Sequence, residues 1–174
     1  MRRTIAIPMA LSATLLAACS MNPRTGGPAA DAKLQPTQGS SAQGVVRFQQ
    51  QGDNVLVAAS FTGLAPGGHG FHIHERGDCS APDASSAGGH FNPTGKPHGH
   101  PHKGEHHAGD LPMLTADANG NASLNATLTS ITLREGPSNI VGRAVIVHSA
   151  PDDFTTQPTG NSGGRLACGV IVAR

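Results

Sequence analysis

Several features that commonly direct an interpretation are scarce in this sequence of 174 residues. Lys and Arg number 12 against 11 Asp and Glu, and no basic stripe is present, so nucleic acid is not an expected partner. Trp and Tyr are absent and aromatic residues make up only 3%, whereas 23 Gly and 13 Pro disfavour helix interiors. No internal repeat appears. The composition argues against a helical bundle and for one domain of short strands and long loops.

The one long apolar run, residues 5–18, is too short to span a bilayer. It follows Arg2 and Arg3, as in a signal peptide, and it ends in small residues just before Cys19, which resembles the lipobox of bacterial lipoproteins. We therefore predict a signal peptide over residues 1–18 and lipid on Cys19, with an incidental Cys after an ordinary signal as the alternative. Two or more acyl chains suffice for stable membrane anchoring. The expected location is the bacterial cell envelope, lipid-anchored and facing the periplasm.

The next segment is rich in Pro, Gly, Ala, Gln and Ser and predicts a flexible tether up to residue 40. Residues 19–40 would then form the lipidated N-terminus and tether, and residues 41–174 the folded domain. Asn119-Gly120 between two apolar segments predicts a hairpin turn. The strand-like segments lie near residues 44–48, 55–61, 70–74, 111–116, 122–128, 140–148 and 168–172.

Two long segments, roughly residues 75–110 and 149–164, show no periodicity. Loops that long within a compact domain are usually functional or disordered. If Cys19 carries lipid, Cys79 and Cys168 remain, and two cysteines in an exported chain predict a disulfide.

Histidine is the outlier of the composition: nine of the ten lie between positions 69 and 107, and the tenth is His148. His72 and His74 flank one residue on a predicted strand, so their side chains share a face and suit a metal. His148 ends another predicted strand, and His90 lies in the first long loop. A set of four His favours copper, whose cupric form accepts tetragonal nitrogen ligation.

The same loop offers further candidate ligands. They are His98, His100, His102, His106, His107 and Asp110. Three His and one carboxylate would make a closed tetrahedral zinc site and fix a loop that has no secondary structure of its own. An exposed His-rich tract that binds metal loosely is the alternative, and composition does not decide between them.

Two long motifs resemble the signatures of copper/zinc superoxide dismutases. They are GFHIHERGDCS (Gly70–Ser80) and GNSGGRLACGVI (Gly160–Ile171), with GGHFNP, HHAGDL and VIVH between them in the family's order. The similarity covers about residues 44–172. It implies an all-β Greek-key barrel or flattened sandwich of about eight antiparallel strands with two long functional loops. It also implies dismutation of superoxide to dioxygen and hydrogen peroxide, with one copper and one zinc per subunit.

The resemblance carries a ligand set onto numbered positions. It implies copper on His72, His74, His90 and His148, and zinc on His90, His98, His107 and Asp110, with His90 bridging the two metals. His98 is preferred because it lies eight positions after His90, the family's spacing, and His107 is preferred over His106 because the family's motif reads His-x-Gly-Asp. His69 matches a structural His of the family.

The resemblance further implies that His90 and Arg165 are catalytic. His90 would deliver a proton to the product, and Arg165 would attract the superoxide anion, since a guanidinium is permanently charged. Residues 153–164 contain no Lys or Glu, unlike the guiding loop of many eukaryotic members. Steering would therefore rest mainly on Arg165, with contributions from Lys96 and Lys103.

Asp152 lies where the family has an Asp that links a copper ligand to a zinc ligand. It would hydrogen-bond His72 and His98 and fix their tautomers, although Asp153 beside it leaves this assignment open. The family's disulfide corresponds to Cys79 and Cys168.

A copper- or zinc-buffering lipoprotein without turnover is the alternative function, and a structural or adhesive β-sandwich is a second rival. Fold alone does not separate them, because unrelated functions share it. The expected partners are superoxide as substrate and a membrane through the lipid on Cys19. The oligomeric state is left open, a homodimer included.

Overall fold

The computed structural model describes Met1 and residues 26–174. The predicted signal peptide beyond Met1, together with Cys19, therefore lies outside the described residues. Within them, regular structure is β apart from the short 3₁₀ helix η1 (Ser85–Ala87), and no helix there is long and apolar enough to cross a membrane. The strands are β1 (Ala29–Pro36), β2 (Gln43–Gln51), β3 (Asn54–Thr62), β4 (Gly67–His69), β5 (Phe71–His74), β6 (Leu114–Ala116), β7 (Ala122–Leu128), β8 (Ala144–His148) and β9 (Arg165–Ala173).

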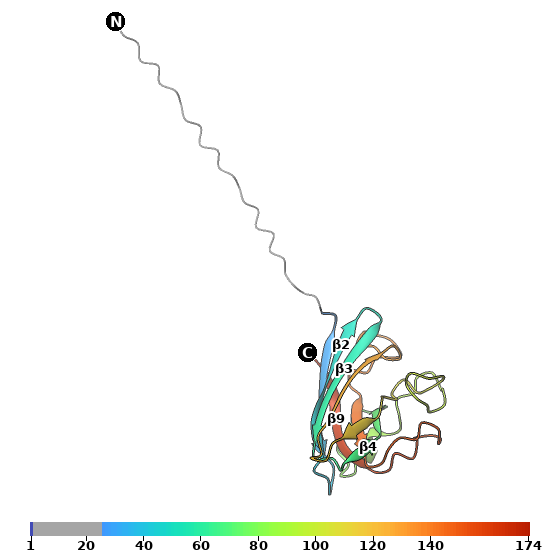
Figure 1. The fold of residues 1–174 in the computed structure, drawn as a ribbon. Helices are drawn as coiled ribbons and strands as arrows, with labels where there is room; N and C mark the ends of the chain where they lie inside the picture. Colours follow the sequence, from blue (N-terminus) through green and yellow to red (C-terminus); the bar gives the residue numbers. More distant parts are fainter. Residues whose placement is uncertain (2–25) are drawn as a thin grey trace.

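The strands form one antiparallel sheet that curls almost into a closed barrel (Figure 1). Their order is β4-β6-β7-β3-β2-β1-β9-β8-β5. The two end strands, β4 and β5, are joined by Gly70 alone, which brings the edges of the sheet close together. The predicted all-β barrel with two long loops is confirmed.

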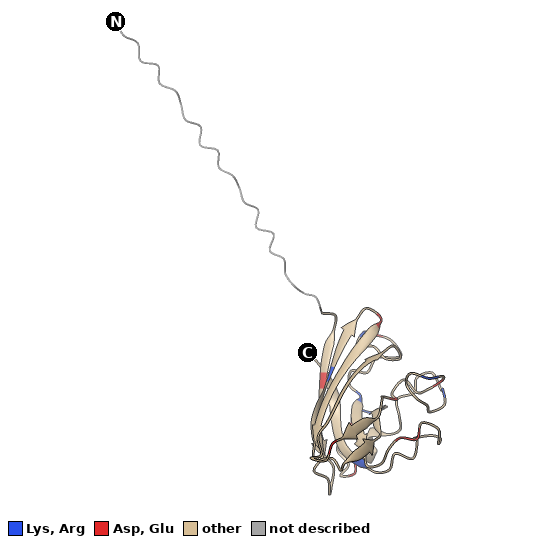
Figure 2. Ribbon diagram, in the orientation of Figure 1, with Lys and Arg blue, Asp and Glu red and all other residues tan. Residues whose placement is uncertain are grey.

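The core is built by apolar side chains that alternate along the central strands. β2 and β3 pair over their full lengths, and Val46, Phe48, Val57 and Phe61 are all at most 2% exposed. Residues between them face outward, as the two-residue period of a strand requires. Figure 2 shows how few charged residues the strands carry.

β5 and β8 differ from the other strands because every residue in them is buried. Phe71 and Ile73 of β5 belong to the barrel core. His72 and His74 alternate with them and so point to the opposite face, opposite Ile146 and Ala144 of β8. The two long loops lie on one side of the barrel (Figure 1), and they cover this face. The fold thus turns one face of two core strands into the floor of a site.

The predicted tether is wrong from Ala29 onward, because residues 29–36 form strand β1 between β2 and β9. Ala30, Ala32 and Leu34 alternate with outward residues and are at most 1% exposed. Alternating small residues give a weak apolar signal, and the flanking Pro and Gly suggested a linker. The folded domain therefore begins before residue 41, and β1 lies between β2 and β9 in the strand order of the sheet.

Two predicted strands begin later than expected. The segment 111–116 is extended only from Leu114, and the segment 140–148 only from Ala144. In the second, Gly142 has a φ of 82°, which an extended strand does not accommodate.

Candidate metal centre

Two strands and one loop bring four imidazoles together. β5 supplies His72 and His74, and the neighbouring β8 ends with His148 after an irregularity in its register with β9. The first long loop returns along β5, where His90 forms an isolated bridge with His74. The backbone of that loop also bonds to β5, since the Phe91 N–H donates to the Ile73 carbonyl at 2.8 Å.

The four imidazoles form a compact, buried group. Each offers one ring nitrogen that lies within 4.8 Å of the others. Nε2 of His74 and Nε2 of His148 are 3.3 Å apart, and the rings of His72 and His90 stack with centroids 3.9 Å apart. None of the four is more than 7% exposed. The structure therefore brings the four predicted copper ligands together in a site that could hold a metal.

A second group surrounds Oδ1 of Asp110. Nδ1 of His90 and Nδ1 of His98 each lie 3.0 Å from this oxygen, and Nδ1 of His107 lies 3.4 Å from it. Nδ1 of His107 is also 3.3 Å from Nδ1 of His90. The three imidazoles thus surround Oδ1 of Asp110, although the group of ligand atoms that all lie within 4.8 Å of one another contains His72 in place of His107.

Backbone donors aim the Asp110 carboxylate. Its other oxygen, Oδ2, accepts hydrogen bonds from the N–H groups of Gly99 at 3.1 Å and His107 at 2.9 Å. Because Oδ2 is occupied in this way, Oδ1 is left to face the imidazoles. Backbone hydrogen bonds within the loop therefore orient the Asp110 carboxylate, although the loop has no regular secondary structure there.

Asp152 links the two groups. Its Oδ2 lies 2.7 Å from Nε2 of His72, and its Oδ1 lies 2.9 Å from Nε2 of His98. A carboxylate at Nε2 favours a proton there and leaves Nδ1 free as a ligand atom. By distance alone His72 also fits with His90, His98 and Asp110. Its ring centroid lies 4.9 Å from that of His148 and 5.8 Å from that of His98, so packing places it with the four-His group.

Two orphaned nitrogens test whether these residues fit metals. Among the described residues, Nδ1 of His72 and Nε2 of His90 are buried side-chain atoms without any hydrogen-bond partner. Buried polar atoms are rarely left unpaired, so each such atom needs an explanation. Both atoms belong to the four-His group, and neutral imidazole nitrogens are ligands that copper and zinc accept. The donor sets therefore fit copper beside four imidazoles and zinc beside three imidazoles and a carboxylate.

Protonation supports ligation by three of these imidazoles, His74, His90 and His148, whereas His98 differs. Burial, reinforced by neighbouring imidazoles, holds the pKa values of His74 and His148 well below their ordinary value, and burial lowers the pKa of His90 to about 4. These rings are consequently neutral near pH 7, as ligation requires. Burial opposes a charge on His98, but hydrogen bonds to Asp110 and Asp152 outweigh it and raise the pKa of His98 to about 9. Without metal this ring is therefore cationic near pH 7, and zinc binding would have to displace its proton.

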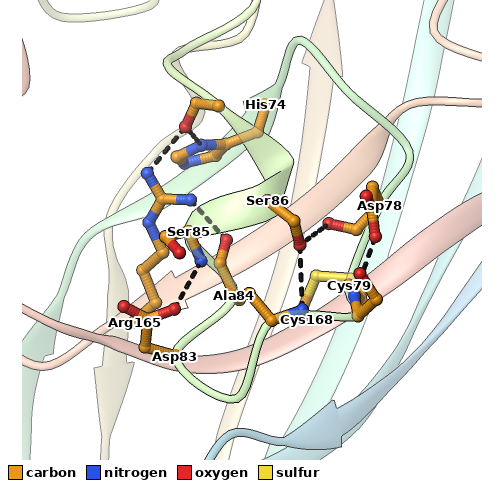
Figure 3. Close-up of a disulfide and its surroundings, with 12 residues drawn as sticks. His74, Asp78, Cys79, Asp83, Ala84, Ser85, Ser86, Arg165 and Cys168 are labelled. Carbon is orange, nitrogen blue, oxygen red and sulfur yellow. Dashed lines mark hydrogen bonds between the residues drawn. A yellow bond between two sulfur atoms is a disulfide. The ribbon is translucent and has the colours of Figure 1, made fainter.

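Arg165 lies beside the four-His group. Its guanidinium donates to the carbonyl of Ala84 at 2.5 Å and to that of Gly88 at 2.6 Å (Figure 3). The Gly88 carbonyl is also 2.9 Å from Nδ1 of His74. The arginine and one imidazole of the group therefore share a single backbone acceptor, which fixes the guanidinium next to the site.

The predicted disulfide between Cys79 and Cys168 is present, with a Cα–Cα distance of 5.8 Å. It ties the loop that carries Ala84 and Gly88 to β9, three positions after Arg165 (Figure 3). The cross-link and the two carbonyl contacts of the arginine thus belong to one structural unit.

The remaining histidines are not brought into either group. The ring nitrogens of His69 lie 2.7 and 2.8 Å from the carbonyls of His148 and Ala65, so both are used in hydrogen bonds. Across the described chain, the groups with converging ligand atoms do not include His100, His102 or His106.

Sequence reasoning missed the role of Gly88. Its φ of 73° favours glycine, and a Cβ there would overlap the side chain of Glu75. The Gly88-Gly89 pair was visible in the sequence, but a backbone carbonyl that serves as a shared acceptor leaves no side-chain pattern to read.

The Greek-key barrel and its two adjoining groups of imidazoles place this protein in a class of β-barrel proteins with a candidate copper and zinc centre. Comparisons with known proteins agree: the family model described as copper/zinc superoxide dismutase matches residues 42–171, so the chain belongs to that family. A solved structure described as the clock protein EA4 is 42% identical, with a TM-score of 0.75, over 83% of this chain and 93% of that chain.

Proposed function

We propose that this protein is an enzyme, a superoxide dismutase that converts superoxide to dioxygen and hydrogen peroxide. The observation that carries the proposal is that His90 belongs to both groups: its Nδ1 faces Asp110, and its Nε2 is a buried nitrogen of the four-His group without a partner. When bound, copper would supply one-electron redox chemistry, which zinc lacks.

Individual atoms of the chain can be assigned to the two metals. Copper would be held by Nδ1 of His72 and by Nε2 of His74, His90 and His148. Zinc would be held by Nδ1 of His90, His98 and His107 and by Oδ1 of Asp110. The short distances between these atoms support the assignment.

Arg165 is the residue that would bind the substrate anion. A guanidinium has five N–H donors, and the contacts with Ala84 and Gly88 use only two of them. The remaining donors and the permanent charge suit a small oxyanion beside the four imidazoles. Lys96 and Lys103 would add to the attraction at long range.

His90 would also handle a proton. Formation of hydrogen peroxide consumes two protons; Nε2 of His90 could carry one of them whenever it does not hold copper, and solvent would supply the other. Burial lowers the pKa of His90 to about 4, so a proton held there is readily released. The catalytic residues of the proposal are therefore His90 and Arg165.

We further propose that lipid on Cys19 anchors the protein in the bacterial envelope, facing the periplasm. The support is the sequence alone: the short apolar run and the small residues before Cys19. Ala29, the start of β1, lies ten positions after Cys19. A chain of ten residues spans at most about 35 Å, so the domain would stay close to the membrane surface.

The test combines elemental analysis with a dismutase assay on the same purified protein. We expect one copper and one zinc per chain and rapid consumption of superoxide. Activity has to be measured, because a solved relative that is 42% identical is described as a clock protein. A fully metallated sample without turnover would contradict the proposal and favour the metal-buffering alternative.

A further inference from the structure

The second long loop holds His98 at several points. Asp152 reaches the ring at Nε2, as described above. Gly160, with a φ of 66°, packs against the same ring, since a Cβ there would lie 2.6 Å from Nε2 of His98 and would overlap Asp152. Residues 152–160 therefore wrap around a residue that lies more than 50 positions earlier in the sequence.

Gln157 holds the backbone of His98. Its Oε1 accepts the His98 N–H at 2.8 Å, and its Nε2 donates to the His98 carbonyl at 2.9 Å. Gln157 is exposed, so packing in the core does not account for these two hydrogen bonds. One amide thus satisfies both backbone groups of His98, as a neighbouring strand would.

This contact matters because His98 has no regular structure around it. In a loop, the position of a ligand depends on hydrogen bonds rather than on a strand or helix. Nδ1 of His98 must lie near Oδ1 of Asp110 while Nε2 faces Asp152, and both distances depend on where the backbone of His98 sits. Partners that orient a ligand commonly change metal affinity by about 10–100-fold when removed.

We propose that Gln157 is a positioning residue for the zinc site, an inference that rests on the proposed function. Its double hydrogen bond fixes the backbone of His98 so that Nδ1 points to Asp110. The same loop treats His100 differently: the ring of Phe154 lies against it, with centroids 4.7 Å apart. The second loop therefore selects which histidine of the first loop faces the carboxylate, a choice that the chemistry of the sequence left open.

The experiment compares three variants of the disulfide-bonded protein. Gln157→Ala removes both hydrogen bonds, Gln157→Glu keeps only the acceptor for the His98 N–H, and Thr155→Ala is the control. Thr155 is exposed in the same loop, and its hydroxyl contacts Asp153 but not His98. Zinc affinity is measured by competition with a chromophoric chelator, and site geometry by the visible spectrum after Co²⁺ replaces zinc.

We expect Gln157→Ala to weaken zinc binding about 10-fold or more and to change the Co²⁺ spectrum. Gln157→Glu should fall between Gln157→Ala and wild type, and Thr155→Ala should match wild type. Thermal unfolding of the metal-free variants should be unchanged, because Gln157 is exposed. A merely structural role would lower that unfolding temperature without altering the Co²⁺ spectrum.

Wild-type zinc affinity and a wild-type Co²⁺ spectrum in Gln157→Ala would overturn this inference while leaving the proposed function intact. If Gln157→Ala did not fold, wild-type affinity in Gln157→Glu would overturn it equally. A wild-type protein that binds no zinc would instead overturn the proposed function and this inference together.

Discussion

His90 connects the two groups of ligand atoms through opposite sides of one ring. Its Nδ1 is 3.0 Å from Oδ1 of Asp110, and its ring stacks on that of His72. His72 also fits both groups by distance, but its Nε2 lies against Asp152 rather than in either group. Changes at His90 should therefore affect both metals at once.

His90→Ala is expected to lose copper and zinc together and to reduce dismutase activity to background. The reason is that each site loses one ligand atom and the two sites lose their connection. Metal content after gel filtration and circular dichroism check the outcome. His102→Ala is the matched control, because His102 is exposed in the same loop and belongs to neither group. Wild-type metal content in His90→Ala would contradict the assignment.

Arg165→Ala is expected to lower kcat/KM about 10-fold or more at low ionic strength and to weaken its dependence on salt. The physical reason is the loss of a fixed positive charge beside the site, and steering of this kind changes on-rates by about 10–10³-fold. Arg165→Lys keeps the charge but not the paired contacts with Ala84 and Gly88, so its rate should be intermediate. Stopped-flow measurements over a salt series would show an unchanged rate if the arginine played no part in guiding the anion.

Side chains and backbone groups differ in how well the sequence predicts them. The seven predicted ligand residues could be read because their motifs are long and ordered, and the structure brings them together. The choice of His98 over His100 needed the family's spacing, since both are imidazoles in one irregular loop. The physical basis of that choice, the amide of Gln157 on the backbone of His98, has no local sequence signal.

At the scale of elements, the two loops depend on β5, β8 and β9 for their positions. β5 carries two imidazoles and bonds to the first loop along its edge. The disulfide attaches that loop to β9. Strong apolar segments such as 44–48 and 55–61 were predictable, and so was the hairpin at Asn119-Gly120, which joins the antiparallel strands β6 and β7.

β1 was missed because its inward residues are mostly alanine, whose small side chain gives little contrast with a linker. Its burial predicts a large effect of a charge within it. Ala32→Asp is expected to destabilise the domain by about 3 kcal/mol or more, since Ala32 is fully buried between β2 and β9. Urea unfolding measures this change. Lys33→Ala, on the outward face of β1, should change stability by no more than about 0.5 kcal/mol.

Equal stability of Ala32→Asp and wild type would mean that residues 29–36 are not part of the cooperative fold. That result would support the flexible tether that the composition predicted for this segment. The same comparison therefore decides where the folded domain begins.

At the scale of the whole molecule, the chain would consist of an envelope anchor, a short connection and a barrel that carries the site. The class of the fold was predictable because composition, strand periodicity and the family resemblance agreed. The start of the domain was not predictable. Residues 29–36 are only weakly apolar, and they form a central strand because β2 and β9 pair with them.

Cys19→Ala is expected to move the protein from the membrane fraction to the soluble fraction of the envelope. The reason is that lipid on this thiol and the new N-terminus would attach the protein to the membrane, and loss of acylation removes that attachment. Fractionation followed by detection of the barrel domain measures the change, with Ser20→Ala as the control. A Cys19→Ala protein that stayed in the membrane fraction would contradict the proposed anchor.

Anomalous diffraction from crystals of the metallated protein, recorded at the copper and zinc absorption edges, tests the shared imidazole most directly. The account predicts one copper peak at Nε2 of His90 and one zinc peak at Nδ1 of the same ring, with Asp110 on the zinc side. A single metal peak, or two peaks with the ring of His90 bound to only one of them, would contradict it.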